Sequence, residues 1–137
     1  MPAREDFQYA IVRVVPRVER GESMNAGIIL LSRRRRFLGA RTSLSVERLR
    51  ALAPACDPDD VRPHLEAVER IAAGDATAGP IASLSAPERF HWLVAPSSTV
   101  VQPAEVHTGM TADPEGTLGH LFAALVERRA EHPVDPT

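Results

Sequence analysis

The side chains best suited to chemistry lie between two strongly apolar runs near the start of the chain. Residues 17–25 read Arg-Val-Glu-Arg-Gly-Glu-Ser-Met-Asn, so guanidinium and carboxylate groups alternate there. A guanidinium can hold a carboxylate or a phosphate, and a carboxylate can transfer a proton or bind a metal. A turn between two strands needs only a few residues, so this charged stretch exceeds what chain reversal requires. We therefore expect a binding site, formed by Arg13, Arg17, Glu19, Arg20, Glu22 and Asn25.

A structural role is the alternative for the same residues. The loop could be held rigid by its own Arg–Glu pairs and by a turn closed on Asn25. Arg13 stands among Val and Ile residues, where an unpaired buried charge would be costly. Its side chain must therefore reach an edge or meet a carboxylate, and a structural ion pair is the alternative to a ligand contact.

A second basic cluster, residues 33–36, consists of four consecutive arginines, with Arg41 close behind. Such a cluster could contact phosphate or nucleic acid. Phe37 is the only aromatic residue interleaved with it, and the chain as a whole is acidic. We therefore expect a solvated turn, or a contact with the acidic second half of the chain, and no nucleic-acid partner.

The remaining reactive residue types form no motif. The five histidines show no HxH, HxxxH or HExxH spacing, and we expect no metal site. Cys56 precedes Asp57 at a predicted helix start, where a thiolate would be stabilised, but no base can be named for it and we expect an inert cysteine. GxSxG, P-loop and GxGxxG patterns are absent from the sequence, so no cofactor is expected and an enzyme is not favoured.

Length and composition indicate one soluble domain. The 137 residues suffice for a single core, and the charged (25%) and hydrophobic (44%) fractions are ordinary for a globular protein. All 16 basic residues are Arg. Residues 1–50 carry 11 Arg against 5 acids, whereas residues 51–137 carry 5 Arg against 13 acids. This asymmetry indicates either an anionic partner for the first half or attraction between the two halves.

The elements that must position these residues follow from hydrophobic periodicity. Apolar residues on both faces of residues 7–17 predict a central strand, which Pro16 should end. Helix starts are predicted at Ser45, Asp57, Ser85 and Asp113, each a good N-cap. Further strands are predicted over residues 26–31, 37–42, 99–102 and 105–108, with a loop over 74–84. The expected fold is α+β: a three-strand N-terminal antiparallel meander plus short later strands, packed with three to four helices.

We expect one domain over residues 1–131 and a frayed tail over residues 132–137. The N-terminus carries no apolar signal segment, and no apolar run is long enough to cross a membrane. A cytoplasmic protein is therefore expected.

Residues 9–30, Tyr-Ala-Ile-Val-Arg-Val-Val-Pro-Arg-Val-Glu-Arg-Gly-Glu-Ser-Met-Asn-Ala-Gly-Ile-Ile-Leu, resemble the opening of a bacterial family of uncharacterised small proteins, domain-of-unknown-function family 3037. Asp113 and Pro114, followed by Leu118, Leu121 and Phe122, look like its C-terminal helix. Ser23 and Met24 stand where the family commonly has an aromatic residue or Val. The resemblance covers most of the chain and implies no catalytic role.

Some members of that family are encoded beside kinases resembling the HipA toxin-type enzymes, which implies a protein partner with such a kinase as the candidate. The function expected is thus a non-catalytic protein-interaction module. The alternative is an enzyme or regulator that acts on a phosphorylated small molecule or nucleic acid through the Arg/Glu loop. A homodimer whose basic and acidic halves pair across the interface is a third possibility.

Overall fold

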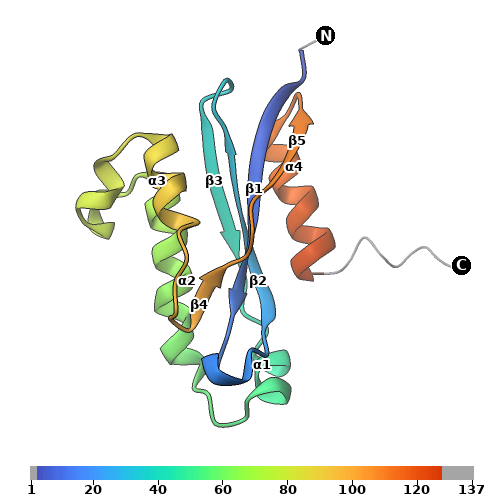
Figure 1. The fold of residues 1–137 in the computed structure, drawn as a ribbon, viewed down its shortest axis with the longest axis vertical. Helices are drawn as coiled ribbons and strands as arrows, with labels where there is room; N and C mark the ends of the chain where they lie inside the picture. Colours follow the sequence, from blue (N-terminus) through green and yellow to red (C-terminus); the bar gives the residue numbers. More distant parts are fainter. Residues whose placement is uncertain (1–2, 128–137) are drawn as a thin grey trace, which may run out of the picture.

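The computed structural model describes residues 3–127. Within this range, a five-stranded antiparallel sheet has helices on both faces (Figure 1), so the predicted α+β class is confirmed. The strands are β1 (Glu5–Val14), β2 (Met24–Ser32), β3 (Phe37–Thr42), β4 (Val101–Pro103) and β5 (His107–Thr111).

Strand β1 is central, as the apolar residues on both of its faces predicted. The strand order in the sheet is β3-β2-β1-β4. Strand β5 pairs with the first half of β1, and β4 pairs with its second half. The strand ends at Val14, three residues earlier than predicted, although the Val15 amide still donates to the Val100 carbonyl oxygen at 2.7 Å. Pro16 has no amide hydrogen to continue the ladder. The two short later strands exist, but each begins two residues after its predicted start.

Each predicted helix start is also confirmed. The helices are α1 (Val46–Leu52), α2 (Pro58–Ala73), α3 (Ala86–Leu93) and α4 (Pro114–Phe122). Their first turns are closed by side-chain oxygens that accept from backbone amides, and these belong to Ser45, Asp57, Ser85 and Asp113. Three short 3-10 helices, η1 (Val18–Arg20), η2 (Ala76–Ala78) and η3 (Pro80–Ser83), occupy loops, and a π turn, η4 (Ala123–Glu127), continues α4.

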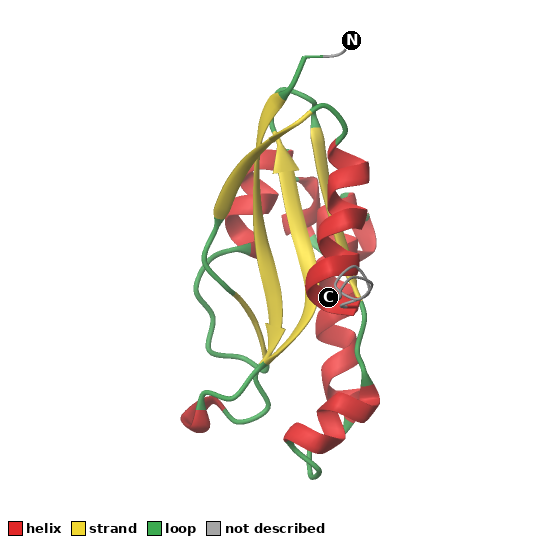
Figure 2. Cartoon of the chain, turned by 90° about the vertical axis from the view of Figure 1, so that its right-hand side faces the viewer, coloured by secondary structure: helices red, strands yellow, loops and turns green. Residues whose placement is uncertain are grey.

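Two hydrophobic cores lie on opposite faces of the sheet, which has helices on either side (Figure 2). On one face, Val12 of β1 belongs to a cluster with Leu65 of α2 and Phe90 of α3. On the other face, Ile28 of β2 belongs to a cluster with Phe122 of α4. Each fully buried aliphatic side chain contributes about 1.5–3 kcal/mol, so both faces add to the stability of the fold.

A bulge in β2 changes which face its first residues occupy. Val12 is opposite Gly27, but Arg13 is opposite Asn25, so Ala26 is the extra residue. The shift places Asn25 beside Arg13 on the α4 face, where Asn25 Nδ2 donates to the Leu125 carbonyl oxygen at 3.0 Å. Gly27 permits the close approach of β3, because a Cβ atom there would lie 2.8 Å from the Arg41 carbonyl oxygen.

Among residues 3–127, no ion pair joins the first half of the chain to the second. Arg20 pairs with Glu22 and Arg34 with Glu5 in the first half, and Arg62 pairs with Asp59 in the second. The halves are joined by the pairing of β1 with β4 and β5 and by charged groups on neutral partners, such as Arg48 on the Val126 carbonyl oxygen. The predicted tail over residues 132–137 lies outside the described residues. No helix in the described part of the chain is long and apolar enough to cross a membrane.

The substitution Gly27→Ala should lower the free energy of unfolding by about 1–3 kcal/mol, because the added methyl group would overlap backbone atoms of β3. Chemical denaturation measures the change. Gly119→Ala is the matched control, since its Cβ would meet only the mobile end of Arg41, 3.1 Å away. Alanine in helix α4 should leave stability unchanged or raise it by up to about 1 kcal/mol. Equal losses of unfolding free energy in Gly27→Ala and Gly119→Ala would contradict the packing argument.

Candidate functional site

The predicted loop is a compact connector between β1 and β2, residues 15–23, at the end of the molecule opposite the β2–β3 turn (Figure 1). Its surplus length forms the helical turn η1, in which the Arg20 amide donates to the Arg17 carbonyl oxygen at 3.0 Å. Gly21 ends the turn with φ = 72°, a left-handed conformation that glycine adopts without strain. The connector is thus an ordered projection.

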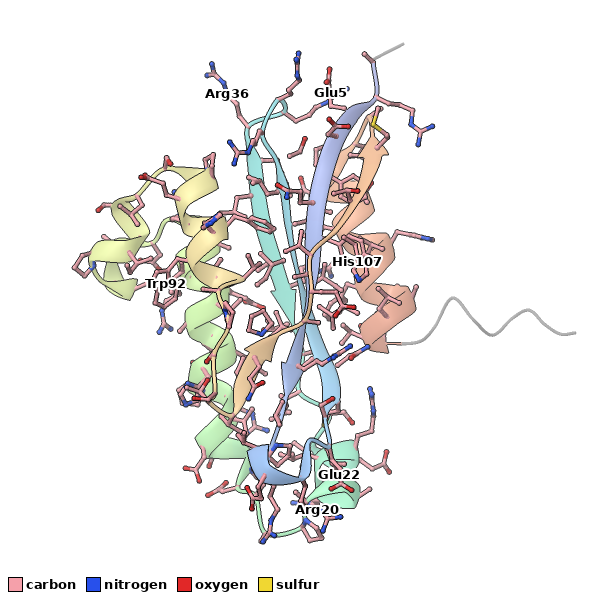
Figure 3. The ribbon with its side chains drawn as sticks, viewed as in Figure 1. Glu5, Arg20, Glu22, Arg36, Trp92 and His107 are labelled. Carbon is pink, nitrogen blue, oxygen red and sulfur yellow. The ribbon has the colours of Figure 1, made fainter. Side chains whose placement is uncertain are left out.

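Arg20 and Glu22 form a bidentate ion pair on this projection (Figure 3). Arg20 Nε donates to Glu22 Oε1 at 2.9 Å, and Arg20 Nη2 donates to Glu22 Oε2 at 3.0 Å. The hydrogen bond from Arg20 holds the pKa of Glu22 below its ordinary value, and Arg17 adds a smaller effect. The same hydrogen bond raises the pKa of Arg20. Self-pairing, the structural alternative for this loop, therefore accounts for two of the predicted residues.

Arg17 and Glu19 remain exposed and form no ion pair with any residue in the range 3–127. Between them lies Val18, an apolar side chain that is 48% exposed. An exposed valine next to unpaired charges adds nothing to the core. Its side chain is free to contact a molecule outside the chain.

A hollow of about 620 Å³ lies between the connector and the link from α1 to α2. Its charged wall carries Arg17, Arg20 and Glu22, and its other wall consists of residues 51–56, which are small or apolar. We call these two walls, together with the exposed Val18 next to Arg17, the connector surface. The fold thus brings three of the six predicted site residues to one hollow with an apolar side.

Asn25 and Arg13 lie apart from that hollow. Asn25 lines a neighbouring one with Arg48, and its amide is already engaged with the Leu125 carbonyl oxygen. Arg48 Nη1 likewise donates to the Val126 carbonyl oxygen at 3.2 Å, so both side chains cap the end of η4. Arg13 is half-buried and makes no ion pair within the described residues. Its environment fits an arginine with a covered stem and a head that reaches water.

Cys56 belongs to the connector surface but its thiol is not activated. Burial raises its pKa, and the negative charges of Asp60 and Asp57 raise it further. Burial and these carboxylates therefore favour the thiol form over the thiolate. Among residues 3–127, no group of three or more His, Cys, Asp and Glu side chains is placed to hold a metal ion.

Several residues of this surface carried no signal in the sequence. Val18 looked like part of a charged loop, and residues 51–56 looked like a helix end with small side chains. Only the folded chain shows that residues 51–56 face the charged side chains of the connector across a hollow. Spacing alone could not have found them, because residues 23–50 separate the two walls in the sequence.

Comparison with known proteins gives one match. The family model described as "Protein of unknown function (DUF3037)" matches residues 9–126. Neither the curated proteins nor the solved structures contain a match to this chain.

The substitution Asn25→Ala should lower the free energy of unfolding by about 1–2 kcal/mol, because it leaves the part-buried Leu125 carbonyl without its donor. Arg17→Ala, on the exposed connector, should change it by less than about 0.5 kcal/mol. Urea denaturation of the two variants measures both effects. Equal stability of Asn25→Ala and the unmodified protein would show that the amide contact does not support the fold.

The Glu22 carboxyl should titrate below its ordinary pKa, and Arg20→Ala should move this pKa upward by removing the paired hydrogen bonds. A carboxylate with a lowered folded pKa stabilises the protein above its unfolded pKa, and this contribution disappears as pH falls through the folded value. NMR titration of the Glu22 side-chain carbon measures the shift. A pKa that stays the same in Arg20→Ala would exclude Arg20 as its cause.

Proposed function

Because the chain belongs to the DUF3037 family of proteins of unknown function, we propose a function from its geometry: a non-catalytic interaction module that binds a protein partner through the connector surface. The observation that carries this proposal is the exposure of Val18 on an ordered projection, beside an apolar-walled hollow and surrounded by charged side chains. Protein interfaces combine an apolar centre with a polar rim in this way.

The partner's chemistry follows from the two parts of the surface. Val18 and the small residues of the α1–α2 link offer apolar contacts, which suit a partner's aliphatic or aromatic side chain. Arg17 and Glu19, which have no ion-pair partner in the described chain, can pair with opposite charges on the rim. A kinase of the HipA-like type, suggested by the family resemblance, is the candidate partner.

The ion pair between Arg20 and Glu22 disfavours the alternative, a phosphate clamp at this loop. A phosphate would compete with Glu22 for both donors of the Arg20 fork, and the Glu22 charge would repel it. The lowered pKa of Glu22 also makes this carboxylate a poor acceptor for a proton in base catalysis. A protein interface can accommodate the pair intact at its rim, which is why we favour the interaction module.

Replacing the two arginines, Arg17→Ala with Arg20→Ala, should weaken binding of the protein partner at least about tenfold while folding is retained. Val18→Glu should have the same effect, because it puts a charge at the apolar centre of the surface. The tagged full-length chain is first used to capture a partner from native lysate, and the complex is then rebuilt from purified proteins for calorimetry. Thermal denaturation verifies that each variant is folded.

The matched control is Arg62→Ala, which removes an exposed arginine that pairs with Asp59 at 2.7 Å on helix α2. It should leave partner binding unchanged. Full affinity in both the double variant and Val18→Glu would refute the connector surface as the interface. Light scattering of the chain alone tests the homodimer, and a dimer that Val18→Glu dissociates would identify a second copy as the occupant.

A further inference from the structure

The arginine turn, residues 33–36, joins β2 to β3 at the end of the molecule opposite the connector (Figure 3). Arg33, Arg34 and Arg36 are exposed, and the side chain of Arg34 is 81% exposed. Arg35 has a structural role. Its Nη2 donates a hydrogen bond to the carbonyl oxygen of Ala3, which links the N-terminal segment to the turn. Three guanidinium groups therefore point into solvent from one short turn.

The acidic groups near this turn only partly offset its charge. Glu5 Oε1 lies 3.8 Å from Arg34 Nε, near the limit of an ion pair. Glu88 lines the same hollow as Arg33, and its Oε1 accepts from the Ser85 amide at 3.0 Å in a capping box whose neutral donors leave its negative charge in place. Asp6 is exposed and remains a local negative charge. Arg4 lies at the same end and donates to the Met110 carbonyl oxygen at 3.1 Å, so its positive charge adds to that of the turn.

The fold supplies the aromatic residue that the sequence lacked beside these arginines. Trp92, on helix α3, is 52% exposed, and it lines a hollow of about 650 Å³ together with Arg33 and His91. Arg33 also lines a second hollow, of about 450 Å³, whose floor includes Gln8 of β1 and Thr108 of β5. Arg33 thus lies between an exposed indole ring and a polar strip of the sheet. The expectation of no nucleic-acid partner depended on the absence of such an aromatic neighbour and on the acidic net charge of the chain.

Arg36 occupies a backbone conformation that arginine does not favour. Its φ is 53°, the left-handed region in which glycine or asparagine is preferred. The Arg36 amide donates to the Arg33 carbonyl oxygen at 3.1 Å in the four-residue loop between the paired residues Ser32 and Phe37, so the hairpin geometry accounts for this conformation. Here the side chain is a cation pointing outward.

We propose that this end of the molecule binds single-stranded nucleic acid. Phosphates would lie on Arg33, Arg34 and Arg36, and a base would stack on the exposed face of Trp92. Of the three arginines, Arg33 shares a hollow with Trp92, while Arg36 lies farther out at the tip of the turn (Figure 3). Cations that follow a backbone toward an aromatic ring are the combination that proteins use for single strands. An acidic peptide would satisfy the arginines but would leave the indole without a stacking partner, so the nucleic acid accounts for more of the surface.

Trp92 is the only tryptophan in the chain, so its fluorescence reports the proposed contact directly. The full-length protein is titrated with unstructured oligothymidine and oligouridine strands of about 12 nucleotides. We expect saturable quenching, with binding that weakens between about 50 mM and 200 mM salt. The logarithm of the binding constant should fall against the logarithm of salt concentration with a slope of about −2 for three phosphates. The two strands test whether DNA or RNA is preferred.

Variants assign the contacts. Trp92→Ala should weaken binding roughly tenfold, measured by anisotropy of a labelled strand, and Trp92→Phe should keep most of the affinity because it retains a ring. Arg33→Ala should lower the affinity and reduce the salt slope by about 0.7. Arg36→Gly should weaken binding while the melting temperature stays equal or rises, since glycine relieves the left-handed backbone. Lost binding in that variant therefore cannot come from misfolding.

Arg62→Ala is the matched control for charge, and the double variant Arg17→Ala with Arg20→Ala controls for the connector; neither should change strand affinity. Three results would overturn the proposal: no binding of either strand, losses in Arg62→Ala equal to those in Arg33→Ala, or a polyglutamate peptide that binds at this turn as tightly as the strands do. The last result would assign the turn to an acidic protein. The connector and the turn lie at opposite ends (Figure 3), so failure of one proposal leaves the other standing.

Discussion

Burial of strand β1 on both faces and along both edges is the constraint on which the other features depend. Its apolar side chains alternate between two cores, which requires α2 and α3 on one face of the sheet and α4 on the other. Its backbone groups pair with β2 along one edge and with β4 and β5 along the other. The charged segments that link the strands are therefore excluded from the middle of the molecule. They gather at its two ends, where both candidate surfaces lie.

The bulge at Ala26 connects one of these ends to the core. It turns Asn25 toward α4, and Asn25 and Arg48 then satisfy the carbonyl groups of Leu125 and Val126 at the end of η4. Carbonyl groups at a helix end otherwise lack partners. The base of the connector is thereby held by the helix on one face of the sheet. A projection with a fixed base can present its side chains in one arrangement, which lowers the entropy lost when a partner binds.

The two ends are both rich in arginine, yet their electrostatics differ. On the connector, Arg20 is neutralised by Glu22 through paired hydrogen bonds, so a mixed surface of apolar and charged groups remains. On the β2–β3 turn, arginines outnumber the nearby carboxylates, and the exposed Arg33 and Arg36 form no ion pair within residues 3–127. A mixed surface is typical of contact with another protein, whereas unneutralised cations beside an indole ring are typical of contact with nucleic acid.

The sequence by itself determined the elements. The caps at Ser45, Asp57, Ser85 and Asp113 and the double-faced apolar pattern of β1 are local signals, because they depend on residues within a few positions of one another. It also located the charged connector between β1 and β2. Only the tertiary structure decided which charges are free. The pairing of Arg20 with Glu22, the capping role of Asn25, the wall formed by residues 51–56 and the position of Trp92 beside Arg33 depend on how the chain folds in space. No periodicity or short spacing encodes most of these contacts, because they join residues that are distant along the chain.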